Sequence, residues 1–395
     1  MTVTSFFGKI DRIRLENDMV TVLNFIKKEI VLVVSLVLAA VSALYVQPDT
    51  AYISYIDFRT LSILLSLMLT MAGLQKLSLF RQIGSFMVYR SHSIRSVILI
   101  FILLNFFFSM VITNDVALIT FVPFTIVTLN LAGRKDLFII TIVLETIAAN
   151  LGSMLTPLGN PQNLYLYSLS GMNFFTFLAL MLPYSIVALL LLMAGCFFSI
   201  RKSPLTGGEP FRKKRTKKEK RLLVMYLLTF LVALLVVLRI LPYYAGLLLV
   251  VLPVLFFDRS ILKKPDYSLL FTFVFLFIFI GNIKRIPQIH QLLSQLIRGH
   301  EVGISVLLSQ FISNVPCAIL CSGFTDKITD LIIGTNLGGL GTLIASMASL
   351  ISFKQYGFTN KANRGKYLLV FSAANLIFLA VMLLTHCLMG IYSPS

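Results

Sequence analysis

Residues 150–163 read Asn-Leu-Gly-Ser-Met-Leu-Thr-Pro-Leu-Gly-Asn-Pro-Gln-Asn, and residues 336–349 read Asn-Leu-Gly-Gly-Leu-Gly-Thr-Leu-Ile-Ala-Ser-Met-Ala-Ser. The two stretches share Asn-Leu-Gly, and Thr156 aligns with Thr342. Both are rich in residues that interrupt a helix, yet both lie inside long apolar runs. In lipid, interrupted backbone is tolerated only where it is buried in protein or lines a cavity. A matched pair of interrupted apolar segments therefore points to the binding site of a transporter.

A second pair of matched elements lies upstream of these breaks. Thr113-Asn114-Asp115-Val116 separates two apolar arms, and Ser313-Asn314-Val315-Pro316 lies in the middle of another apolar run. Each half of the chain is therefore predicted to contain an apolar hairpin with a polar tip, followed by a helix broken at its middle.

The composition indicates an integral membrane protein. Hydrophobic residues make up 57% of the chain and charged residues 13%, with a mean hydropathy of +0.91, whereas soluble domains average about 25% charged residues. The apolar runs are long enough for spanning helices and lack the alternation of a membrane barrel, so the predicted class is all-α and polytopic. The net charge of +18 lies in loops, which favours membrane topology over nucleic-acid binding. No nucleophile–base pair or phosphate-binding loop is present, so we expect no enzymatic activity.

The chain is expected to form two inverted repeats. The predicted parts are an N-terminal amphipathic cytoplasmic segment (1–29), a first repeat (30–200), a basic cytoplasmic linker (201–221) and a second repeat (222–395). The start carries no cleavable signal-peptide pattern. We expect a multi-pass protein of the cytoplasmic (inner) membrane, with its N-terminus inside and its C-terminus outside.

The first hairpin is predicted to be re-entrant. Arg95 and Arg134 bracket its two arms, and basic residues favour the cytoplasmic face. The tip leaves no room for an outer loop, so both arms enter and leave from inside. Two complete spans joined by a tight outer turn are the alternative. The hairpin of the second repeat is expected to enter from the opposite face.

The tips and breaks supply the groups that an ion and an anion need. Free N–H groups at half-helix N-termini suit an anion, and loosened carbonyls with Asn and Thr oxygens suit Na⁺. We predict one Na⁺ site at Asn114, Gly152 and Thr156, and a second at Asn314, Gly338 and Thr342. The predicted substrate-binding residues are Thr113, Asn114, Pro161, Asn163, Ser313, Asn314, Ser346 and Ser349. The alternative is that the small residues only allow close helix packing.

Two carboxylates fall inside apolar spans, where they are costly and count as functional candidates. Asp115, at the first tip, is a candidate Na⁺ ligand or proton carrier; it could also cap the second arm of the hairpin. Glu145 is a candidate proton carrier, or a neutral partner in helix packing.

These tips and breaks resemble the ion transporter superfamily, which includes divalent-anion/sodium symporters, citrate carriers, arsenite permeases and sodium/proton antiporters. In the symporters, two Ser-Asn-Thr tips each precede a Gly-rich discontinuous helix. The first break is especially similar to uncharacterised bacterial anion permeases of that group. The resemblance covers about residues 60–385. It implies a homodimer with a scaffold domain and a hairpin-bearing transport domain that moves as an elevator.

The tips also depart from that pattern, since Asp115 and Val315 replace the third Thr. The missing hydroxyl argues against an ordinary succinate or citrate carrier and favours a smaller or differently shaped anion. We therefore expect a secondary transporter for a small anion, without a cofactor, coupled to Na⁺ or, as the alternative coupling ion, to H⁺. A Na⁺/H⁺ antiporter or an arsenite-type efflux permease is the alternative. A membrane scaffold or receptor would leave the duplicated breaks unexplained.

Overall fold

The computed structural model describes residues 29–392 except 90, 92, 205–213 and 360–362. The predicted N-terminal segment (1–29) and the middle of the predicted linker lie almost entirely outside the described residues. Within them the regular structure is helical, and Ser93 and Pro204 form an isolated β-bridge. Together with eight candidate membrane spans, this confirms the all-α, polytopic class.

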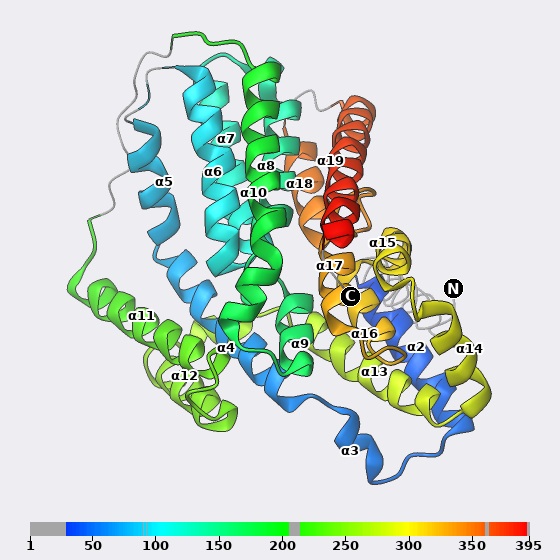
Figure 1. Cartoon of the computed structure of the whole chain (residues 1–395). Coiled ribbons are helices and arrows are strands. Elements are labelled where there is room, and N and C mark those ends of the chain that lie inside the picture. Colours follow the sequence, from blue (N-terminus) through cyan, green and yellow to red (C-terminus); the bar gives the residue numbers. More distant parts are fainter. Residues whose placement is uncertain (1–28, 90, 92, 205–213, 360–362, 393–395) are drawn as a thin grey trace, which may run out of the picture. The chain divides into compact units, whose positions relative to one another are not determined.

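Figure 1 shows the helices coloured in their order along the chain. The first half contains α2 (Ile30–Tyr45), α3 (Ala51–Tyr55), α4 (Phe58–Lys76), α5 (Leu79–Tyr89), α6 (Ile94–Ile112), α7 (Asn114–Leu131), η1 (Lys135–Leu137), α8 (Phe138–Ser153), α9 (Pro161–Ser170) and α10 (Phe174–Ser199). The second contains α11 (Lys217–Val237), α12 (Tyr243–Phe257), η2 (Arg259–Lys263), α13 (Tyr267–Lys284), α14 (Pro287–Ile297), α15 (Glu301–Ile312), α16 (Asn314–Cys321), α17 (Ile328–Leu337), α18 (Met347–Gly357) and α19 (Arg364–Tyr392).

Eight helices of the described chain are long and apolar enough to cross a membrane: α4, α6, α7, η1 with α8, α10, α11, α13 and α19. They differ in how much of their surface the protein covers. The α8 span is 83% buried and the α19 span only 22% buried. Helix α8 is therefore a core helix, whereas α19 presents most of its apolar surface outward, as a lipid-facing helix does.

The chain forms two compact units. Of the described residues, the first unit comprises those within 29–56 and 266–289, and the second comprises those within 57–265 and 290–392. Each unit contains segments from both halves of the sequence, so the packing units do not follow the order of the predicted repeats.

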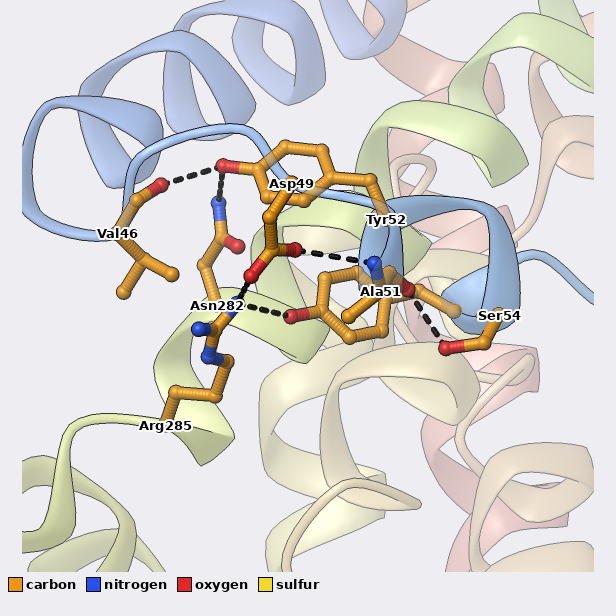
Figure 2. Close-up of polar contacts among 8 residues, drawn as sticks. Val46, Asp49, Ala51, Tyr52, Ser54, Asn282 and Arg285 are labelled. Carbon is orange, nitrogen blue, oxygen red and sulfur yellow. Dashed lines mark hydrogen bonds and ion pairs between the residues drawn. The ribbon is translucent and has the colours of Figure 1, made fainter.

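Helices α2, α3 and α13 pack together in the first unit (Figure 2). The Asn282 amide donates to Ser42 Oγ at 3.0 Å and to the Tyr52 hydroxyl at 2.8 Å, and Tyr52 donates in turn to the Val46 carbonyl at 2.6 Å. Arg285 pairs with Asp49 at 2.8 Å. A buried amide thus joins α13 to the end of α2, with an exposed ion pair beside it.

In the second unit, α8 is surrounded by α6, α7, α10, α18 and α19. Helices α6, α7, α8 and α10 run side by side (Figure 1). A separate group within this unit consists of α4, α11 and α12. It is tied by Lys76, whose ammonium contacts Asp258 at 2.8 Å.

Two features of the second unit differ from the sequence prediction. Residues 79–89 form helix α5, in a stretch that the sequence showed only as basic. Helix α11 begins at Lys217, inside the predicted linker, because Thr216 and Glu219 form a capping box that starts the helix early.

Candidate functional site

Both predicted hairpin tips have the same unusual backbone. Thr113 joins α6 to α7 with φ 72° and ψ 149°, and Ser313 joins α15 to α16 with φ 71° and ψ 153°. A positive φ is rare for residues with a side chain. The same strained turn at two matched places indicates that each tip is held by its surroundings.

Each tip is held by the broken helix of its own half through two hydrogen bonds. The Asn114 N–H donates to the Gly159 carbonyl at 3.2 Å, and the Asn314 N–H donates to the Ala345 carbonyl at 3.0 Å. In return, Thr156 donates to the Met110 carbonyl. In the second half, the Thr342 hydroxyl donates in the same way to the Gln310 carbonyl, at 3.0 Å. Gly159 and Ala345, like Thr156 and Thr342, occupy matching positions in the two breaks.

The first glycine of each break allows the hairpin to approach closely. A methyl group at Gly152 would lie 2.1 Å from the Phe106 carbonyl oxygen, and one at Gly338 would lie 2.6 Å from Ser309 Oγ. Contacts below 3.0 Å do not occur for a real Cβ. Only glycine therefore lets these hairpin arms contact the breaks, which is why both predicted ion-site glycines lie directly against a hairpin.

The two halves meet through the asparagines that begin the breaks. The Asn150 amide donates to the Gly339 carbonyl and to Ser349 Oγ, both at 3.4 Å. The Asn336 amide donates to Asn163 Oδ1 at 2.6 Å. Asn150 matches Asn336, and Ser349 matches Asn163, so each half donates the same cross-half bond to the other.

Asn150, Asn163, Asn336, Gly339 and Ser349 form a cluster that joins the two halves. Both hairpin tips reach this cross-half cluster. The Asn114 amide donates to Asn150 Oδ1 at 3.1 Å, and Ser346 donates to the same oxygen at 2.9 Å. On the other side, Asn314 Nδ2 lies 3.1 Å from the position a Cβ would take at Gly339. Asn114 and Asn314 are 3% and 5% exposed. Neither faces the surroundings, and the chain Asn114–Asn150–Gly339 connects one tip to the other.

The remaining predicted residues lie around this cluster. Pro161 is the first residue of α9, and the Asn163 amide donates to the carbonyls of Ser153 and Thr156 at 3.2 and 3.3 Å. Asp115 lies in the first turn of α7, whose N-cap is Thr113. The capping role considered for Asp115 is therefore wrong, because the helix already begins at Asn114.

Glu145 is fully buried and precedes Asn150 on α8, nearer the N-terminal end of the helix than the cluster. One carboxylate oxygen accepts a hydrogen bond from Thr125 of α7, and the other has no hydrogen-bond partner among the residues that the structure describes. The structure thus separates the two carboxylates, with Asp115 at the tip and Glu145 between packed helices.

The cluster consists of neutral oxygen and nitrogen groups. Its side chains are amides and hydroxyls, and the helices α7, α9, α16 and α18 begin beside it. The described residues contain no group of three His, Cys, Asp or Glu side chains that could hold a metal. This set suits a weakly bound hard cation and an anion at helix N-termini, and it does not suit a transition metal.

Several polar residues of the site were not predicted from the sequence. Asn150 and Asn336 opened the quoted stretches but were not assigned a role, although they carry the cross-half bonds. Asn160 donates to Ser153 inside the first break. Gln310 binds the second break. The repeated Asn-Leu-Gly could have identified the first two, whereas Gln310 has no counterpart in the first half.

The chain is similar in sequence to known proteins. A family model described as "Citrate transporter" matches residues 20–329. An uncharacterised transporter of Methanocaldococcus jannaschii is 33% identical over 283 residues, which are 71% of this chain and 76% of that protein. The inner membrane protein YbiR of Escherichia coli K12 is 32% identical over 305 residues, 76% of this chain and 80% of that protein. The silicon efflux transporter LSI3 of rice is 31% identical over 142 residues, 35% of this chain and 28% of its own length.

Proposed function

The chain belongs to the citrate transporter family of the ion transporter superfamily, and from this premise we propose that it is a Na⁺-coupled secondary transporter of a small anion. It is a multi-pass membrane transporter and not an enzyme, as its family and its relatives are. The cytoplasmic membrane is its proposed location, in keeping with the inner membrane protein of E. coli.

The observation that carries this proposal is the buried cluster where two hairpin tips meet two broken helices. Polar groups inside a membrane protein are costly, so a cluster of this size is retained for binding. The side-chain amide of Asn114 and the hydroxyls of Ser346 and Ser349, which come from both halves, converge on Asn150. Na⁺ bound within the cluster would offset the charge of an anion.

Mechanistically, we propose that the anion binds between the two tips after Na⁺. The unit formed by the hairpins and the breaks then moves as one body and exposes the anion to the other face. The reciprocal bonds between the halves support such a rigid movement, since separation of the halves would break the bonds of both Asn150 and Asn336. The resemblance to the ion transporter superfamily also implies a homodimer in which one domain is a stationary scaffold.

The tips limit the substrate. Asp115 and Val315 stand where a third tip hydroxyl would bind a dicarboxylate, and an acidic residue disfavours a multiply charged anion nearby. A small anion with one charge is therefore expected to bind better than citrate or succinate.

The test is a thermal-shift screen of the purified protein with small anions, in Na⁺ and in choline. A ligand that binds only the native state stabilises it, so Na⁺ should increase the stabilisation by the anion. The matched control is Asn150→Ala, which removes the centre of the cluster and should abolish the shift. If anions stabilise the protein equally without Na⁺, the proposed coupling is wrong.

Efflux of an uncharged oxyacid is the second candidate. It is favoured by the absence of Lys, Arg and His among the described residues of the cluster, together with the similarity to a silicon efflux transporter. Amides and hydroxyls bind a neutral hydroxyl-bearing molecule without any counter-charge. In this case silicic or arsenious acid, and not the anions, would stabilise the protein, and Na⁺ would have no effect.

A further inference from the structure

Gln310 fills the second break with its side-chain amide. Its Nε2 lies 3.1 Å from the Gly338 carbonyl oxygen, 3.0 Å from that of Leu340 and 3.0 Å from that of Val306. Its Oε1 accepts the Thr342 N–H at 2.9 Å. The amide group therefore sits among three carbonyl oxygens at the place where Gly338 and Thr342 were predicted to bind Na⁺.

The first half has no such amide at the matching place. Gln310 lies three residues before the tip Ser313, and Met110 lies three residues before the tip Thr113. A methionine side chain has no N–H to donate. The Met110 main chain makes the same bond as the Gln310 main chain, accepting from the break threonine. The two halves thus differ in the side chain and agree in the backbone.

A second position differs together with the first. Gly341, with φ 114°, stands where the first break has Leu155. A methyl group at Gly341 would lie 2.2 Å from Gln310 Oε1, so the glycine makes room for the amide. The half that contains Met110 therefore has Leu155 at this position, and the half that contains Gln310 has Gly341.

The carbonyls of the first break are less occupied by side chains. The Gly152 carbonyl accepts the backbone N–H of Leu155 at 3.2 Å, and no side-chain donor to it is found in the described residues. The Met154 carbonyl, which matches Leu340, receives the Asn163 amide at 3.5 Å, the outer limit of a hydrogen bond. Ser109, Asn114 and these carbonyls therefore still offer oxygen lone pairs to a cation.

The geometry points to Gln310 as a resident substitute for the second cation, so that one Na⁺ binds per chain, at the Asn114 tip. Amide hydrogens carry partial positive charge and satisfy the same carbonyl oxygens that Na⁺ would bind, without any ion. This inference rests on the proposed Na⁺ coupling and fixes its stoichiometry. It also explains why the second tip stays ordered without a carboxylate, whereas the first tip carries Asp115.

The test counts Na⁺ ions by titrating the thermal stability of the purified protein, since the steepness of the response reports the ions bound to the native state. The wild type should bind about one Na⁺, and Gln310→Ser, which opens the carbonyl cage, should bind about two. Gln310→Met is the matched control. It removes the same hydrogen bonds but keeps the cage filled, so it should bind about one.

Each result decides between the possibilities. Two ions in the wild type, or equal counts in the Ser and Met variants, would overturn the role of Gln310 and leave the Na⁺ coupling intact. A Na⁺ response that is absent from the wild type and appears in Gln310→Ser would support the role of Gln310 and refute the proposed coupling at the first tip. No response in any variant would refute both.

Discussion

Asn336 donates its side-chain amide to Asn163 Oδ1 at 2.6 Å, across 173 positions of the chain. The matching hydrogen bond in the opposite direction runs from the Asn150 amide to the Ser349 hydroxyl. The segment before each break is thus hydrogen-bonded to the segment after the other break: α17 to α9, and α8 to α18. The two breaks therefore form one polar core. In the proposed transport step, the two breaks would therefore move together.

The first prediction concerns this bond. Asn336→Ala leaves Asn163 Oδ1 buried without its donor, which should cost about 1–3 kcal/mol and reduce transport. Thermal unfolding in detergent and uptake into proteoliposomes are the measurements. Asn375→Ala is the control, because the buried Asn375 amide donates only to Phe371 of its own helix. Equal loss of transport in both variants would refute a specific role for the cross-half bond.

The second prediction concerns the glycine contact. Gly152→Ala places a methyl group against the Phe106 main chain, which cannot rotate away. Overpacking of this kind costs about 1–3 kcal/mol, so the melting temperature and Na⁺ binding should both fall. In Gly195→Ala the new methyl lies 3.5 Å from Leu144, an ordinary contact. A Gly152→Ala protein with unchanged Na⁺ binding would show that the close approach does not shape the ion site.

The third prediction concerns acid stability. Asp258 is largely buried, which raises its pKa, but hydrogen bonds from Lys76, Ser260 and Tyr226 outweigh burial and hold the pKa below its ordinary 3.8. A lowered pKa means that the carboxylate stabilises the fold above pH 3.8 and that this contribution is lost as the pH falls through the folded-state pKa. The wild type should therefore lose stability below about pH 4 more steeply than Asp258→Asn.

Melting temperatures of both proteins between pH 3 and 7 check this. At pH 7 the wild type should be the more stable, because the variant cannot form the Lys76 ion pair at 2.8 Å. Parallel acid curves for the two proteins would contradict the prediction.

The fourth prediction concerns Glu145. Glu145→Gln keeps an acceptor for Thr125 but cannot exchange a proton. If the carboxyl carries protons, which is one of the two roles considered for Glu145, the variant should fold with an unchanged melting temperature and lose the pH dependence of transport. Uptake at pH 5.5 and pH 8 is the measurement. Thr146→Val is the control, since the Thr146 hydroxyl donates within its own helix to Ile142. An unaltered pH profile would leave Glu145 with a packing role.

Much of this fold was predictable from sequence because apolar length and glycine content are local properties. The polar hairpin tips and both breaks were expected, and they lie where α6 gives way to α7, α15 to α16, α8 to α9 and α17 to α18. Helix α5 was missed because a short amphipathic helix resembles a basic loop when only charge is considered. The start of α11 was misplaced because the Thr216–Glu219 capping box lies among charged residues.

The site was predictable only in part. The tips and the glycines were predicted because their residue types indicate a turn and a close approach between helices. The partners of Asn150 and Asn336 were not, because a bond across 199 or 173 positions depends on packing that no local pattern encodes. Gln310 was missed for a different reason: comparison of the halves emphasises what they share, and Gln310 is a difference between them.

The bond between Ser42 and Asn282 links residues 240 positions apart within the first compact unit. During synthesis, α2 leaves the ribosome long before α13 exists. The Ser42 hydroxyl, which donates to the Ala39 carbonyl of its own helix at 2.8 Å, therefore receives the Asn282 amide only after more than half of the polypeptide has followed. Biogenesis of this protein thus includes a late joining step, and substitutions at Asn282 should impair maturation even where the finished site is untouched.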